Sequence, residues 1–178
     1  MRLRSLAAAA LGTALATVAA FPVSAQERCR LSWEIPPADS TYTRQHAIDV
    51  GDVPGHQVRV FEAHRRFPND KPNCEGLRRT DSWVHATSDY VDRNGSVSGY
   101  LTIMLENGDK IFGGMSGTSQ TSTNPDGSQR SVATTVTTYT GGTGRYQGVR
   151  GVQRESIIFD PARNFTQAQA EAEYWLER

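Results

Sequence analysis

The sequence predicts an all-β protein: a small antiparallel up-and-down β-barrel of about eight strands, with an irregular N-terminal arm that follows a signal peptide. Three observations favour this class. Side chains alternate with period two in several segments, turn-forming residues separate these segments roughly every 8–12 residues, and no segment has the period of a convincing long helix. A barrel is favoured over a sandwich because closure removes exposed strand edges.

The N-terminus has the features of a secretory signal peptide. Arg2 and Arg4 precede an apolar run from Leu6 to Ala20, and Val23-Ser24-Ala25 offers small residues where a signal peptidase would cut. The apolar run is short for a membrane span, which needs about 20 residues. We expect residues 1–25 to be removed, which would leave a periplasmic or secreted chain without a membrane span.

Removal of these residues changes the charge balance. It takes away two arginines and no acidic residue, so 19 basic and 19 acidic side chains become 17 and 19, a net charge of −2. No basic surface for nucleic acid is expected from this balance. Residues 26–55 contain several prolines and glycines and are predicted to form the irregular arm, while residues 56–178 form one barrel domain.

The chain has two cysteines, Cys29 and Cys74. In an exported protein they are expected to form one disulfide, and closing a loop of about 45 residues contributes about 3–4 kcal/mol in the loop-entropy description. The cysteines lack CxxC spacing and the four histidines form no HxxxH pair, so no metal site is predicted.

The first barrel strand is predicted over His56–Phe67, and its period does not decide which face is interior. One face carries Val58, Val60, Glu62, His64 and Arg66, and the other carries Gln57, Arg59, Phe61, Ala63 and Arg65. Neither face is cleanly apolar. If the valines point inwards, Glu62 and His64 follow them, and this is the arrangement that we predict.

Further strands are predicted over Leu77–Tyr90, Ser96–Glu106 and Lys110–Ser119. The turns between and after them are predicted at Asp92-Arg93-Asn94-Gly95, Asn107-Gly108-Asp109 and Asn124-Pro125-Asp126-Gly127. Asn94-Gly95 gives the strongest of these signals, because an Asn-Gly pair suits the tight turn of a hairpin.

A Thr/Val-rich strand from Val132 to Tyr139 then meets a glycine-rich corner and resumes in VQRESIIF. The corner, YTGGTGRYQGVRG over 139–151, resembles the signature corner of the allene oxide cyclase-like and dirigent β-barrels, which are of calycin type. The resemblance implies a barrel whose interior holds a hydrophobic or phenolic small molecule without a cofactor. Only the glycine corner matches, so no catalytic residue is carried over from those families.

The segment Phe165–Arg178 contains strong helix formers, yet its alanines alternate with polar residues at the period of a strand. A strand is favoured here and a helix is the alternative. Tyr139 and Tyr146 are interpreted as packing residues of the corner rather than as catalysts.

Polar groups that alternation places inside a barrel are the candidates for chemistry, since a buried carboxylate or imidazole needs a partner or a ligand. The predicted catalytic residues are Glu62, His64, Asp81 and His85, in which a carboxylate orients an imidazole for proton transfer. The predicted substrate-binding residues are Arg66 and Arg79, for an anionic oxygen, and Trp83 and Tyr100, for a flat wall. The alternative is that the row from Arg79 to His85 faces solvent.

Two functions of different classes follow. The first is an exported isomerase, cyclase or lyase that needs no cofactor and acts on a hydrophobic or phenolic molecule inside the barrel. The second is a non-catalytic periplasmic carrier for such a molecule. A third interpretation, favoured less, is a homo-oligomeric subunit that assembles through its outer face, as the dirigent resemblance permits.

Overall fold

The computed structural model describes residues 27–160 and 165–177 of the 178-residue chain. These residues form nine strands and two short 3₁₀ turns: β1 (Cys29–Ile35), η1 (Pro37–Asp39), β2 (Ser40–Asp49), β3 (His56–Arg66), β4 (Arg79–Val91), β5 (Asn94–Leu105), β6 (Lys110–Thr123), β7 (Gln129–Gly142), η2 (Gly144–Tyr146), β8 (Val149–Asp160) and β9 (Phe165–Leu176). The all-β prediction is therefore confirmed. The predicted signal peptide lies outside the described residues, among which no helix has the length and apolarity to cross a membrane.

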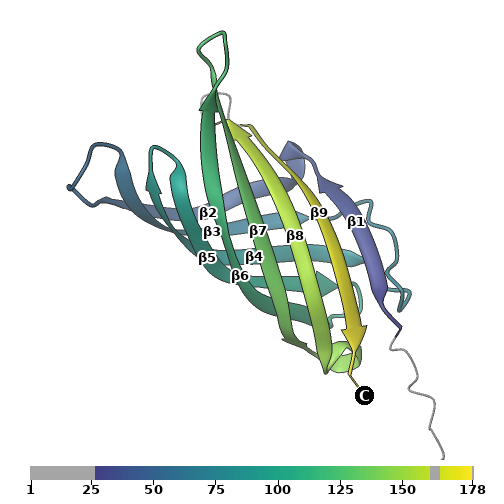
Figure 1. Cartoon of the computed structure of the whole chain (residues 1–178). Coiled ribbons are helices and arrows are strands. Elements are labelled where there is room, and N and C mark those ends of the chain that lie inside the picture. The colour runs from purple at the N-terminus through teal and green to yellow at the C-terminus, as the bar shows by residue number, and fades with distance from the viewer. Residues whose placement is uncertain (1–26, 161–164, 178) are drawn as a thin grey trace, which may run out of the picture.

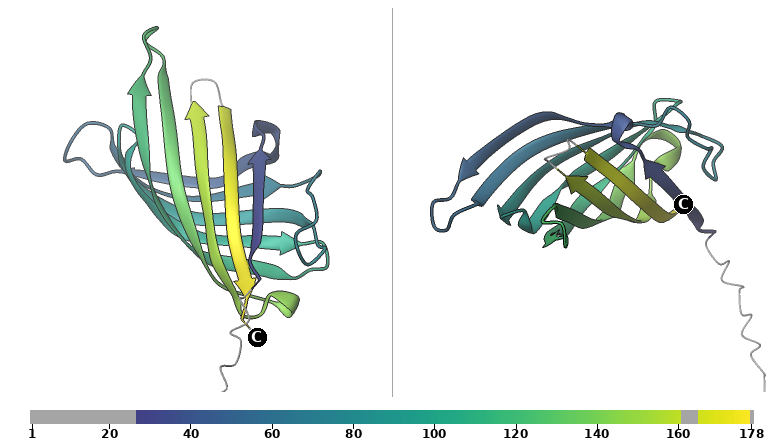
Figure 2. Two further views of the ribbon diagram at one scale, coloured as in Figure 1. Left: turned by 45° about the vertical axis from the view of Figure 1, so that its right-hand side comes forward. Right: turned by 90° about the horizontal axis from the view of Figure 1, so that it is seen from above.

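All nine strands belong to one antiparallel sheet in the order β1-β9-β8-β7-β6-β5-β4-β3-β2. Consecutive strands from β2 to β9 are neighbours, which is the predicted up-and-down arrangement. The sheet curls, so that β8 and β9 cross the front of the molecule and β3 and β4 lie behind them at a steep angle (Figure 1). Figure 2 shows the same curl after a 45° turn about the vertical axis and from above.

The curled sheet is not closed into the predicted barrel. β1 pairs with β9 and β2 pairs with β3, and no ladder joins β1 to β2. Pro36 and the 3₁₀ turn η1, which begins with Pro37, lie between the two strands, and neither proline has an N–H group to donate to a ladder. The two edges of the sheet are nevertheless consecutive in the chain.

The predicted irregular arm, residues 26–55, is for the most part strand, and this prediction is wrong for β1 and β2. β1 directs Cys29 and Ile35 into the core, with 5% and 1% of their surfaces exposed. β2 is an exposed edge strand of mainly polar residues, so its sequence has no apolar alternation to detect. The prolines break the arm, but into two strands rather than into a loop.

The glycine corner and the C-terminal segment fold as predicted. β7 and β8 flank η2, where Gly144 has a φ of +52° and its backbone passes close to the Asp109 carboxylate. β9 is a strand that buries Ala168, Ala170, Ala172 and Tyr174 on its interior side. The alternation therefore outweighed the helix propensity of this segment.

The hairpin turn between β4 and β5 is centred two residues before the Asn94-Gly95 pair that gave the signal for it. Its two central residues are Asp92 and Arg93, with φ values of 48° and 66°, as in a type I′ turn. Asn94 and Gly95 already belong to β5, and a Cβ at Gly95 would lie 2.1 Å from the carbonyl oxygen of Asp89. The glycine is needed for close strand contact rather than for the turn itself.

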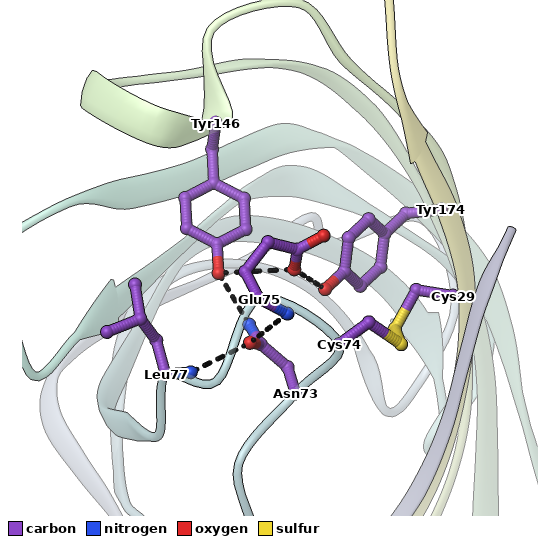
Figure 3. Close-up of a disulfide and its surroundings, with 7 residues drawn as sticks. All are labelled: Cys29, Asn73, Cys74, Glu75, Leu77, Tyr146 and Tyr174. Carbon is purple, nitrogen blue, oxygen red and sulfur yellow. Dashed lines mark hydrogen bonds between the residues drawn. A yellow bond between two sulfur atoms is a disulfide. The ribbon is translucent and has the colours of Figure 1, made fainter. Parts of the chain in front are cut away.

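One end of the curled sheet is covered by the loop between β3 and β4, residues 67–78, and we call it the disulfide end. The predicted disulfide between Cys29 and Cys74 is present and ties this loop to β1 (Figure 3). Next to it, Tyr174 and Tyr146 donate hydrogen bonds to Glu75, and Asn73 donates one of 2.6 Å to Tyr146.

These contacts join parts of the sheet that are far apart in the strand order. Tyr174 belongs to β9 and Tyr146 to η2, whereas the loop leaves β3 and enters β4. Both rings are almost completely buried, and burial raises the pKa of Tyr146 to about 12. The disulfide end of the interior is thus filled with side chains, and the phenols act as hydrogen-bonding groups rather than as charges.

Replacement of both Cys29 and Cys74 by alanine is expected to lower the free energy of unfolding by about 3–4 kcal/mol, because the bridge closes a loop with a sequence separation of 45 residues. Urea unfolding of the variant and of the wild type, with and without reductant, measures the difference. Unchanged stability, or two reactive thiols in the folded protein purified without reductant, would contradict the role assigned to this bridge.

Candidate functional site

The interior opens at the end opposite the disulfide end, and we call this opening the mouth pocket. It has a volume of about 480 Å³. One wall comes from β2, β3 and β4, and the other comes from the adjoining ends of β8 and β9. The side chains that matter most for its chemistry are Tyr42, Gln45, Arg59, Tyr90, Phe159 and Phe165.

Arg59 is held in the mouth pocket by aromatic rings. Its guanidinium carbon lies 4.6 Å from the ring centroid of Phe61 and 5.3 Å from that of Tyr42, and its Nη1 donates a 2.9 Å hydrogen bond to Gln45. Tyr42 and Phe61 meet edge to face at 5.5 Å. The wall therefore combines a fixed positive charge with flat apolar surfaces.

Tyr90 completes this wall on β4. Burial raises the pKa of its phenol, and the nearby Arg59 guanidinium offsets part of the increase. At neutral pH the Tyr90 side chain is a neutral group that can donate a hydrogen bond. Ser88, also on β4 and also facing the mouth pocket, has a buried hydroxyl without a hydrogen-bond partner among the described residues.

The mouth pocket leads to a smaller space deeper in the sheet, of about 50 Å³, which we call the inner cavity. The two share Tyr42, Arg59, Tyr90 and Phe159 in their walls. The remaining wall is largely apolar, with Phe61, Ala63, Val84, Val97, Met115 and Ile157, while Arg65 and Thr135 are its deep polar residues.

Arg65 and Glu155 form an ion pair across the interior. Arg65 belongs to β3 and Glu155 to β8, strands that the sheet order separates by β4, β5, β6 and β7. Arg65 Nη1 lies 2.5 Å from Glu155 Oε1, and the two side chains are 7% and 4% exposed. The pair joins opposite walls. Arg65 lines the deep end of the inner cavity, which we call its floor, and Glu155 adjoins that floor through its contact with Arg65.

A second set of side chains fills the interior between this floor and the disulfide end. Arg79 forms an ion pair of 2.5 Å with Asp70, and its guanidinium lies 3.7 Å from the ring centroid of Trp33. Tyr139 donates a hydrogen bond to Gln153, and burial raises its pKa well above the usual range. Tyr139 and Tyr146 thus have the packing positions predicted for them.

The predicted interior position of Glu62 and His64 is wrong. On β3 the buried residues are Phe61, Ala63 and Arg65, so the even-numbered side chains point to the outer face, the side of the sheet away from the interior. Val60 is 57% exposed on that face. The parity was misjudged because the interior accepts arginines that are paired or stacked, while the valines lie outside.

The structure still brings the four predicted catalytic residues together, but on the outer face. His85 lies 3.0 Å from Glu62, and His64 lies 2.7 Å from Asp81. The Thr43 hydroxyl and then His85 hold the pKa of the Glu62 carboxyl below its usual range. These are cross-strand pairs between β3 and β4, which matches the alternative of a solvated, paired face.

The predicted substrate-binding residues are divided between the two faces. Trp83 stacks on His64 with ring centroids 4.2 Å apart, and Tyr100 is 42% exposed, both on the outer face. Arg66 points outwards to Asp39, 3.4 Å away. Arg79 alone among the eight predicted residues is interior, because the register shifts between Arg79 and Asp81, and it is committed to Asp70.

Sequence reasoning missed the residues that line the mouth pocket and the inner cavity. The face of β3 that carries Arg59, Phe61 and Arg65 was predicted to point away from the interior. The segment that contains Tyr42 was predicted to be an irregular arm. One signal was available: Phe61 and Ala63 alternate with Glu62 and His64, so the face with the larger aromatic residue was also the face free of carboxylates.

No group of three or more His, Cys, Asp or Glu side chains is placed to hold a metal ion within residues 27–160 and 165–177.

Comparison of the chain with protein-family models, with curated proteins and with solved structures finds no match.

His56 links the loop beside the mouth pocket to β4. Its Nδ1 lies 2.5 Å from Asp52 and its Nε2 lies 2.7 Å from Asp89. The hydrogen bond to Asp89, and then that to Asp52, raises the pKa of the imidazole above its ordinary value. The loop also lies against the hairpin turn, because Asp92 N donates to the carbonyl of Gly55.

Because the folded-state pKa of His56 is raised, its contribution to stability is expected to be complete below the unfolded pKa of about 6.5 and to be lost as pH rises through the folded value. The difference in unfolding free energy between wild type and His56→Gln should therefore be larger at about pH 5.5 than at about pH 9. Denaturation at both values measures it, and an NMR titration gives the midpoint. A midpoint at or below that of an ordinary histidine would contradict this assignment.

Proposed function

We propose that this chain binds a hydrophobic or phenolic small molecule in the mouth pocket and inner cavity. The observation that carries the proposal is the one-ended interior: a space of about 480 Å³ leads to an enclosed cavity, and aromatic side chains surround a fixed guanidinium. The volume falls in the range of small-molecule sites, about 300–1,000 Å³, and the inner cavity adds the largely apolar lining that is typical of them.

The composition of the wall indicates the class of ligand. Phe61, Phe159 and Phe165 offer rings against which a flat or unsaturated body can lie, and Tyr42 and Tyr90 add rings with a hydroxyl. The mouth pocket also carries polar side chains, among them Gln45, Gln57 and Arg59, and these would orient a ligand whose rings lie against the aromatic residues.

Two further features support the proposal. The glycine corner at 139–151 resembles that of the allene oxide cyclase-like and dirigent barrels, whose interiors hold molecules of this kind. The disulfide Cys29–Cys74 is consistent with a periplasmic or extracellular location, where such a protein would meet its ligand.

A second candidate function is conversion of the bound molecule by an isomerase, cyclase or lyase reaction. It is supported by Tyr42, Tyr90 and Arg59, which come from three adjacent strands and line one pocket. A neutral phenol can donate a proton, and a guanidinium can stabilise negative charge that develops on an oxygen. This version of the catalytic proposal replaces the outer-face pairs Glu62–His85 and His64–Asp81.

Substitution of Tyr42 by alanine is expected to weaken binding of 2-methoxynaphthalene about tenfold, because the ligand loses an aromatic contact worth about 1 kcal/mol or more. Tyr100→Ala is the matched variant: both tyrosines are about equally exposed, 41% and 42%, but Tyr100 lies on the outer face. Naphthalene fluorescence and calorimetry measure the affinities in purified mature protein.

The same samples distinguish the two candidate functions. Native mass spectrometry of the protein with phenolic and polyunsaturated compounds reports retention, and chromatography reports conversion. Retention without any product supports a binding protein, and conversion that Tyr90→Phe abolishes supports the catalytic candidate. Absence of retention for every compound, or a loss of binding in Tyr100→Ala and not in Tyr42→Ala, would refute the interior site.

A further inference from the structure

We propose that the floor of the inner cavity recognises a hydroxyl group, so that the ligand is a neutral phenol or alcohol that enters with its hydroxyl end first. The inference rests on the proposed function and identifies the class of ligand. It comes from the ion pair between Arg65 and Glu155, whose residues are 6% and 5% exposed and meet across the interior.

The ion pair leaves hydrogen-bonding capacity unused. Arg65 Nε and Glu155 Oε1 are both buried and have no hydrogen-bond partner of good geometry among the described residues, although Oε1 is in ionic contact with Arg65 Nη1. A buried polar atom without a partner costs about 1–3 kcal/mol. Arg65 Nε is therefore an unpartnered donor, and Glu155 Oε1, whose contact is the ionic one with Nη1, keeps a lone pair that can accept a hydrogen bond.

The donor belongs to a residue that lines the inner cavity. Arg65 is part of its wall, together with Thr135, which is 3% exposed and lies opposite Glu155 in the β7–β8 ladder. The other buried guanidinium, Arg79, lies nearer the disulfide end, binds Asp70 through two nitrogens and stacks on Trp33. Of these two buried guanidinium groups, Arg65 is the one that a ligand in the inner cavity would reach, whereas Arg59 lines the same cavity nearer the mouth pocket and donates to Gln45.

The charge of the pair selects the functional group. Arg65 and Glu155 together carry no net charge, so a carboxylate at the floor would gain little from the guanidinium and would be repelled by Glu155. An ether oxygen can accept a hydrogen bond from Arg65 but has none to donate to Glu155. A hydroxyl does both, since it is one donor and one acceptor in a single small group.

The first test compares ligands that share one ring system: 2-naphthol, naphthalene, 2-methoxynaphthalene and 2-naphthoate. Wild-type protein is expected to bind 2-naphthol about tenfold more tightly than each of the others, the effect of roughly one or two hydrogen bonds. Equal affinity for 2-naphthol and naphthalene would overturn this inference while leaving the proposed function intact. Failure of all four to bind would instead refute the proposed function.

The second test changes the floor. Arg65→Met with Glu155→Leu replaces the pair by apolar residues of similar size, a change that buried ion pairs tolerate better than loss of one partner. The double variant is expected to bind naphthalene as before and to lose the preference for 2-naphthol. The matched control, Arg150→Met with Glu177→Leu, alters an exposed Arg–Glu pair and should keep the preference. A preference that survives in the first double variant would overturn the inference.

A third variant tests the charge argument by removing the negative charge of Glu155. Glu155→Gln keeps the size of the side chain and leaves Arg65 as an uncompensated positive charge, so affinity for 2-naphthoate is expected to rise at least about tenfold over wild type. Circular dichroism establishes that each variant is folded. No gain for 2-naphthoate in folded Glu155→Gln would contradict the assigned role of the pair, and the wild-type ligand series remains decisive if a variant does not fold.

Discussion

The segment Cys29–Asp49 supplies both edge strands of the sheet, and the interior depends on this constraint. β1 pairs with β9 and β2 pairs with β3, while only Pro36 and η1 lie between the two strands. The edges therefore stay close to each other, and a nine-stranded sheet with adjacent edges has to curl. An open sheet of the same strands would leave one apolar face against water, at a cost of about 25 cal/mol for each Å².

The curl creates a space that the chain fills in layers from one end. Contacts between opposite walls follow one another towards the disulfide end: Arg65 with Glu155, then Arg79 with Trp33, then Glu75 with Tyr174. Buried charges and phenols are stable there because each has a charged, aromatic or hydrogen-bonding partner. The opposite end has aromatic side chains at its rim and no comparable contact between its described walls, so the space there stays open.

Local signals in the sequence were enough for much of this fold. The strand period, the glycine corner and the alternation in β9 depend on neighbouring residues, and the disulfide was predicted from the presence of two cysteines behind an expected signal peptide. β1 was missed because its partner β9 is distant in the chain, and β2 was missed because its mainly polar, exposed residues have no apolar alternation. The candidate site was missed because alternation gives two faces but not their direction, and here Arg59 and Arg65 lie inside while Val60 lies outside.

The covered disulfide end restricts the path by which a small molecule could enter or leave the interior. Tyr146 and Tyr174 are almost fully buried there, and the loop that binds them is fastened to β1 by a covalent bond. If the mouth pocket binds a ligand as proposed, the described residues at the disulfide end block passage there, and the ligand would leave through the mouth pocket by which it entered. The proposed site would then be a pocket open at one end, and Tyr42 and Arg59 in its wall would be the residues whose substitution changes the rate of ligand release.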